Sequence, residues 1–149
     1  METHDKHSLL TKIREERRAF DALVGRLTDE AISAPMFRGG WAVKDMLLEI
    51  AGWERSLVDR TTGGRSDAGA APAAAQSLSP GEARAESRAA HAALVAHVAE
   101  MSEADLQDPY RWEWADGRPL VHVLAAGSRE RYHAHTEEIA RHLGSEDES

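Results

Sequence analysis

Four stretches of the chain repeat apolar side chains every three or four residues, and this spacing constrains the fold more than any other feature. In residues 5–27 the repeat consists of Leu9, Ile13, Phe20, Leu23, Val24 and Leu27. From Val43 to about Asp59 it consists of Val43, Met46, Leu47, Ile50, Trp53, Leu57 and Val58. Such spacing places the apolar side chains on one face of a helix, which must pack against other helices.

The third stretch carries the clearest helix start in the sequence. Ser79 is the expected N-cap, Pro80 the first helical residue and Glu82 the partner that completes a capping box. Its apolar face consists of Leu94, Val95, Val98 and Met101, and His91 lies on the same face. The fourth helix is predicted from about Pro119 to Leu143, with Gly144 as a left-handed cap. The sequence therefore predicts an all-α four-helix bundle.

The segments between these stretches predict how the helices are connected. Residues 60–79 are rich in Gly, Ala, Ser and Pro without a regular apolar period, which indicates a flexible crossover between the second and third helices. TDEAISAP at residues 28–35 is echoed 74 residues later by SEADLQDP, and a Trp-containing segment follows each. We therefore expect two related αα-hairpins in a single domain over residues 1–144, followed by an acidic, mobile tail over residues 145–149.

Composition excludes several classes of function. The 149 residues suit one domain, and 26 acidic against 18 basic residues give a net charge of −8, which repels nucleic acids and anionic membranes. The absence of cysteine excludes disulfides, thiolate nucleophiles and cysteine-based metal sites. No apolar signal segment, phosphate-binding loop, HExxH or nucleophile elbow is found. We expect a cytoplasmic protein that binds neither nucleic acid nor membrane.

The apolar face of the fourth helix becomes polar halfway along. Leu120, Val123, Leu124 and Gly127 are followed on that face by Arg131, Ala134, His135 and Glu138. An unpaired buried charge costs about 3–5 kcal/mol, so a charge here must find a partner or open a pocket to water. Alternatively, this end of the helix extends beyond the core and is simply solvated. Glu49 borders the second apolar face in the same ambiguous way.

Several segments resemble a known family. GGWAVKDMLLEIAGWERSL is similar to the second-helix signature of DinB-like four-helix bundles, especially the ClbS/DfsB-type branch. GRPLVHVLAAGSRERYHAHTEEIARHL resembles their last helix, and REERRAFDALVGRLTDEAI their first. The resemblance implies an up-down-down-up bundle, often a homodimer, with an interhelical pocket that in many relatives holds a divalent metal on three histidines. Here the three histidine positions correspond to Glu49, Arg131 and His135.

These substitutions change the chemistry expected of the pocket. A guanidinium cannot donate a lone pair to a metal, so we predict no cofactor and a hydrogen-bonded ion pair between Glu49 and Arg131. If a divalent metal such as zinc or nickel is bound after all, Glu49 and His135 are its expected ligands.

Three functions stay open, and the sequence does not decide whether the protein is an enzyme. The first is a ClbS/DfsB-like protein that binds or acts on a small molecule without metal. In it Glu49 or His135 serves as general base and Arg131 stabilises anionic charge, within a pocket completed by Trp53, His91 and Glu138. The second is a metal-dependent thiol transferase or hydrolase of the DinB-like type. The third is a non-enzymatic bundle that acts through dimerisation or partner binding.

Overall fold

All the secondary structure in the described part of the chain is helical. The structure is a computed structural model that describes residues 5–35, 37–62 and 77–147. Its elements are α1 (Lys6–Val24), α2 (Asp29–Ser33), η1 (Arg38–Gly40), α3 (Val43–Thr62), α5 (Pro80–Glu100), α6 (Glu103–Gln107), η3 (Glu113–Ala115) and α7 (Leu120–Asp147). The predicted all-α class and the four long helices are confirmed.

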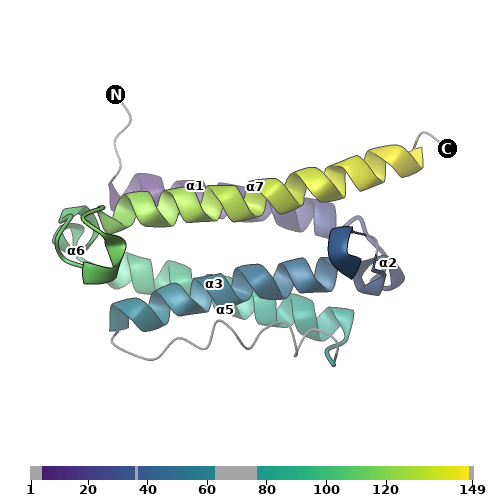
Figure 1. Cartoon of the computed structure of the whole chain (residues 1–149), viewed down its shortest axis with the longest axis horizontal. Coiled ribbons are helices and arrows are strands. Elements are labelled where there is room, and N and C mark those ends of the chain that lie inside the picture. Colours follow the sequence, from purple (N-terminus) through teal and green to yellow (C-terminus); the bar gives the residue numbers. More distant parts are fainter. Residues whose placement is uncertain (1–4, 36, 63–76, 148–149) are drawn as a thin grey trace.

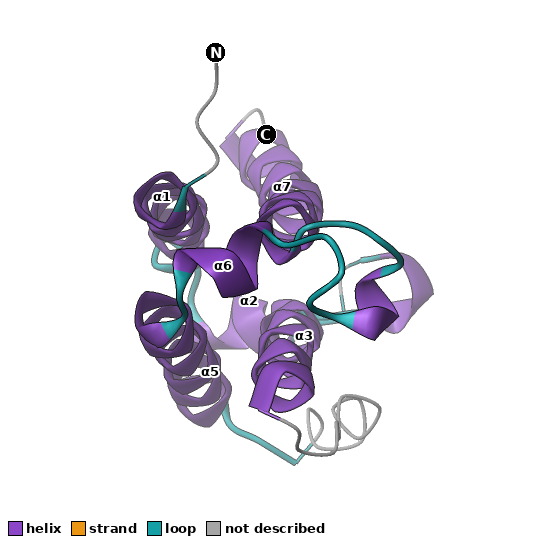
Figure 2. Ribbon diagram, turned by 90° about the vertical axis from the view of Figure 1, so that its left-hand side faces the viewer, coloured by secondary structure: helices purple, strands orange, loops and turns teal. Residues whose placement is uncertain are grey.

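The long helices form a bundle of two packed pairs. α1 packs along α7 and α3 along α5, while α2 and α6 lie at opposite ends of the bundle (Figure 1). In the end-on view, α1 is diagonally opposite α3, and α5 is diagonally opposite α7 (Figure 2). The prediction that the first two long helices form one αα-hairpin and the last two another is therefore wrong, because α1 packs on α7 and α5 on α3. The segments containing α2 and α6 are long enough to carry the chain across the end of the bundle.

The two halves of the chain do repeat the same order of elements. In each half a long helix is followed by a five-residue helix, a short 3-10 helix and a second long helix. Both five-residue helices start with the same device, because Thr28 Oγ1 accepts from the Ala31 N–H at 3.1 Å and Ser102 Oγ from the Asp105 N–H at 3.0 Å. The predicted capping box at Ser79 and Glu82 is also present.

Some predicted boundaries are wrong. α1 ends at Val24, α3 extends to Thr62, and α7 continues through Gly144 to Asp147. The predicted left-handed cap at Gly144 is therefore wrong, because Gly144 lies inside α7 and is not among the glycines with positive φ. Within the predicted crossover, residues 63–76 lie outside the described part of the chain, as do residues 148–149 of the predicted tail.

Two apolar clusters fill the interior, one toward each end of the bundle. The first contains Leu9, Ile13, Leu57, Leu94, Val98, Met101, Leu106, Trp112, Ala115, Leu120, Val121 and Leu124. The second contains Phe20, Val24, Ile32, Val43, Met46, Leu47, Ile50, Ala83, Tyr132, Ile139 and Leu143. No helix in the described ranges has both the length and the apolarity needed to span a bilayer.

The buried face of α7 is rotated from the predicted one. Ser128 and Tyr132 lie in the interior, each 1% exposed, whereas Ala134 is exposed. Arg131 and His135 are half-buried at the margin of that face. The apolar repeat alone does not show which polar residue continues the buried face. Tyr132 does so, because its aromatic ring buries more apolar area than the aliphatic stem of Arg131.

Candidate functional site

The three residues singled out at the positions of the family's histidines lie together between α3 and α7. Glu49 Oε2 is 2.8 Å from His135 Nε2, which is a hydrogen bond. Glu49 Oε1 is 3.8 Å from Arg131 Nε, which is an ion pair beyond hydrogen-bond length. The residues therefore converge, but the expected Glu49–Arg131 hydrogen bond is wrong, because the Glu49 carboxylate bonds to His135 instead.

Aromatic rings flank these three residues. Trp41 stacks on the His135 ring with centroids 6.2 Å apart, and the Arg131 guanidinium lies 4.5 Å from the centre of a Trp53 ring. Trp53 fits against α7 because residue 127 is glycine, since a Cβ there would overlap the indole. The close approach of α3 and α7 at this point thus depends on Gly127 and holds Arg131 over a flat apolar surface.

A cavity of about 430 Å³ opens beside these residues. Its wall includes Glu49, Trp53, Arg60, Trp114, Arg118 and Arg131. His135, although bonded to Glu49, does not line this cavity, and neither does Glu138, which was also expected in the pocket. Trp114 thus lines a cavity, whereas Trp112 caps the core and donates from Nε1 to the Asp105 carbonyl at 2.9 Å.

His91 lies elsewhere, in a buried polar network that connects all four long helices. Its Nδ1 is 2.9 Å from Oε2 of Glu54, and the same oxygen accepts from the Tyr132 hydroxyl at 3.1 Å. Arg17 Nη1 donates to Ser87 Oγ at 2.7 Å and lies 3.4 Å from the Tyr132 oxygen. Burial and the charge of Glu54 raise the pKa of Tyr132, so its hydroxyl keeps its proton and donates.

Four members of this network, Arg17, Glu54, Ser87 and Tyr132, were not predicted, although the sequence carries a signal for two of them. Glu54 lies four residues after Ile50 and three before Leu57, so it interrupts the apolar repeat of α3 on its buried side. Arg17 interrupts the repeat of α1 in the same way. A charged residue in the gap of a regular apolar repeat indicates a buried polar partner on another helix. Arg17 and Glu54 each follow a residue of one apolar cluster and precede a residue of the other, so both lie at the boundary between the clusters.

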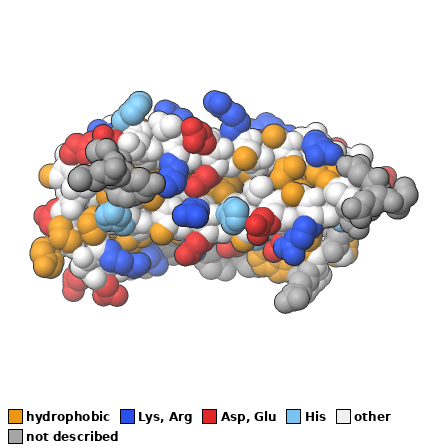
Figure 3. Space-filling view, turned by 90° about the horizontal axis from the view of Figure 1, so that it is seen from above, with side chains coloured by type: hydrophobic (Ala, Val, Ile, Leu, Met, Phe, Trp, Pro, Cys, Tyr) orange, Lys and Arg blue, Asp and Glu red, His pale blue; other side chains and the backbone are white. Residues whose placement is uncertain are grey.

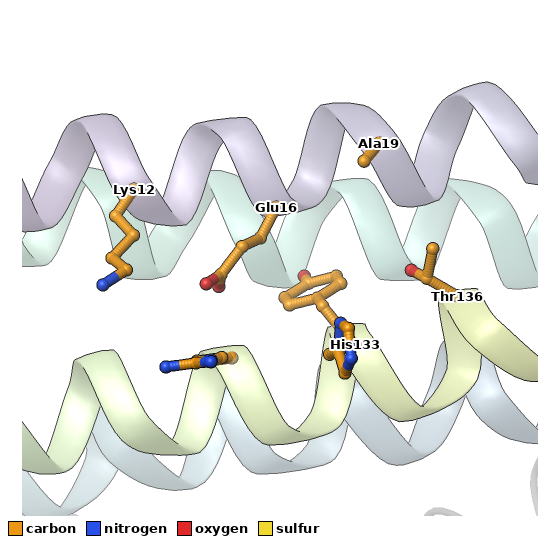
Figure 4. Close-up of a pocket in the computed structure, with 7 residues that line it drawn as sticks. Lys12, Glu16, Ala19, His133 and Thr136 are labelled. Atoms are coloured by element: carbon orange, nitrogen blue, oxygen red, sulfur yellow. The ribbon is translucent and has the colours of Figure 1, made fainter.

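A second, smaller cavity of about 250 Å³ lies between α1 and α7. Lys12 and Glu16 of α1 extend toward α7 there, opposite His133 (Figure 4). The Ser128 hydroxyl donates to Glu16 Oε2 at 2.7 Å, and burial raises the pKa of Glu16. On the outer face seen in Figure 3, side chains of both charges and histidines are interspersed, so this face has no broad surface of one sign.

The residues at the three family positions do not fit the three-histidine metal site. In the described part of the chain, no group of three or more His, Cys, Asp or Glu side chains is arranged to hold a metal ion. A metal-ligating histidine normally donates its other ring nitrogen to an acceptor, yet His135 Nδ1 is buried without a hydrogen-bond partner among the described residues. The Arg131 charge beside Glu49 would also repel a cation.

Comparison with known proteins identifies the family. The DinB superfamily profile matches residues 12–143, which is most of the chain. No curated protein and no solved structure matches this chain. Because the match spans α3 and α5 and most of α1 and α7, with both sides of the cavity, this chain belongs to the DinB superfamily.

Proposed function

We propose that this protein is a ClbS/DfsB-like member of the superfamily that binds a small molecule in the 430 Å³ cavity and acts on it without a metal. The observation that carries this proposal is the position of Glu49. One carboxylate oxygen is hydrogen-bonded to His135, while the side chain also lines the cavity beside Arg131. A carboxylate held in this way is suited to accept a proton from water in the cavity.

The neighbouring residues support the same chemistry. When His135 Nε2 carries a proton it donates to Glu49, which fixes the carboxylate in place; the stacked Trp41 ring fixes the imidazole in turn. Arg131 brings a permanent positive charge to the same wall, where it stabilises negative charge that develops as water adds to a substrate carbonyl. Glu49 is thus the proposed base and Arg131 the proposed anion-stabilising group.

The branch and the topology are part of this proposal. The signature segments around Trp41 and Trp53 support the ClbS/DfsB branch. The directions of α1, α3, α5 and α7 in Figure 1 support the up-down-down-up order. The homodimer implied by the resemblance stays a prediction, which sedimentation analysis can test.

Hydrolysis of the activated ester para-nitrophenyl acetate by the full chain tests the proposed chemistry. Loss of a positioned base typically costs about 10²-fold or more in rate, so Glu49→Gln should lower turnover by at least that order. His135→Ala should also lower turnover, because it removes the hydrogen bond that holds the Glu49 carboxylate. His133→Ala is the matched control, because His133 is an exposed histidine on the same helix. Unchanged turnover in both Glu49→Gln and His135→Ala would contradict the proposed mechanism.

A further inference from the structure

We propose that the 430 Å³ cavity selects a planar aromatic carboxylate. This inference rests on the proposed function and names its class of ligand. The cavity is formed by α3, α7 and the η3 segment between α6 and α7. Its volume lies within the range of about 300–1,000 Å³ that is usual for small-molecule sites.

The charge of the wall is the first reason. Arg60, Arg118 and Arg131 line the cavity with Glu49 as the acidic side chain among its lining residues, although the whole chain carries a net charge of −8. Within the described ranges, neither Arg60 nor Arg118 has a carboxylate at ion-pair distance, and Glu49 already bonds to His135. The wall therefore has an excess of positive charge that an anion would neutralise.

Unsatisfied hydrogen-bond donors are the second reason. Trp114 Nε1 and Arg131 Nε are both buried, and neither has a hydrogen-bond partner among the described residues. Both atoms are donors, and both belong to side chains of the wall. A buried donor without an acceptor costs about 1–3 kcal/mol, so a ligand whose acceptor oxygens reach these nitrogens after a small shift of the two side chains relieves a cost that a ligand rich in donors does not.

The flat surfaces of the wall specify the rest of the ligand. The guanidinium of Arg131 lies over Trp53, and that of Arg60 lies 5.3 Å from the centre of a Trp114 ring. A planar aromatic ring extends such guanidinium–indole stacks with little loss of conformational freedom. Glu49 on the same wall disfavours a dianion, which makes a carboxylate a better match than a phosphate ester.

Naphthoate and its neutral isostere naphthamide test the inference, with titration of each into the full chain. The indole N–H signals of Trp53 and Trp114 report occupancy in NMR spectra, and the dissociation constants follow from their shifts. We expect naphthoate to bind about tenfold more tightly than naphthamide, with a preference that declines as salt is added. Arg60→Gln and Arg118→Gln should each reduce that preference by about threefold, which is the scale of an exposed charge pair, because both arginines are exposed.

Arg129→Gln is the matched control, because Arg129 lies two residues from Arg131 on α7 but lines the other cavity. It should leave the affinity for both compounds unchanged. Equal binding of naphthoate and naphthamide would overturn the anionic ligand class while leaving a binding cavity in place. Absence of binding by both up to their solubility limits would also overturn the inference, and the ester hydrolysis experiment would then decide the proposed function separately.

Discussion

At the scale of single residues, the cavity wall depends on a residue with no side chain. Gly127 allows the Trp53 indole to lie against α7, and its carbonyl is 3.4 Å from Nη1 of Arg131. The indole in turn supports the Arg131 guanidinium. The identity of residue 127 thus controls the position of both large side chains.

Gly127→Ala should therefore disturb the wall as well as the fold. The new Cβ overlaps Trp53, and overpacking of this kind typically costs about 1–3 kcal/mol of unfolding free energy. Gly144→Ala is the matched control on the same helix: a Cβ at residue 144 would meet no other side chain within 4 Å, so alanine there should stabilise α7 by up to about 1 kcal/mol. Urea unfolding measures both changes. Equal effects of the two substitutions would contradict this account of Gly127.

The convergence of Glu49, Arg131 and His135 was predicted from the resemblance to DinB-like bundles, which places all three at the positions of one metal site; the apolar repeats alone show only that each lies at or beside a buried face. Their hydrogen bonding could not be predicted, because the period places a side chain only to within a sector of the helix. Tyr132 shows this limit clearly, since it is fully buried next to Arg131 although the repeat favoured Arg131. A tyrosine is compatible with either environment, and its burial depends on partners from other helices.

At the scale of elements, the contact between α1 and α7 includes the carboxyl group of Glu16, and burial there disfavours its charged form. Glu16 accepts from Ser128 across this contact, and desolvation raises its pKa above 4.5 in spite of the nearby Lys12, Arg129 and His133. The folded state therefore holds this proton more tightly than the unfolded chain. The resulting stabilisation is complete below pH 4.5 and is lost as the pH rises through the folded pKa.

Glu16→Gln should remove this dependence, because the amide oxygen still accepts from Ser128 but does not titrate. The substitution should raise the melting temperature at neutral pH relative to the wild type, and the difference should shrink toward zero as the pH falls below 4.5. Glu15→Gln, which alters an exposed carboxylate at the adjacent position, serves as the control. If the difference in melting temperature between Glu16→Gln and the wild type did not change with pH, the raised pKa of Glu16 would be contradicted.

The starts of the helices could be predicted, but their arrangement could not. Ser79 and Glu82 lie three residues apart, so their capping box is a local property of the chain. The diagonal placement of α1 and α3 depends instead on which apolar faces bury most area together, which is a property of all four helices. The echo between the two halves indicated a repeated order of elements but not which helices pack side by side.

At the scale of the whole molecule, a polar layer separates the two apolar clusters. Arg17, Glu54, Ser87, His91 and Tyr132 form this layer, and each long helix contributes to it. The layer was not predicted, because its hydrogen bonds exist only once all four helices are in place. It specifies the axial register of the helices, because a helix displaced along its axis would leave buried polar groups without partners.

Tyr132→Phe should destabilise the bundle by about 1–3 kcal/mol, since it leaves a buried acceptor on Glu54 with one partner fewer. Tyr110→Phe removes the same hydroxyl from a side chain that is 86% exposed, and it should leave the unfolding free energy nearly unchanged. Chemical denaturation of the two variants makes the comparison. A loss no larger for Tyr132→Phe than for Tyr110→Phe would contradict the structural role of the polar layer.

The pairing of α1 with α7 and of α3 with α5 means that each packed pair takes one helix from either half of the chain. Neither half can therefore bury its apolar faces alone. Two fragments, one ending after α3 and the other beginning before α5, should be largely unstructured when separate and should associate into the native bundle when mixed. Because Glu49 and Arg131 lie on different fragments, the cavity would be assembled only in that reconstituted complex.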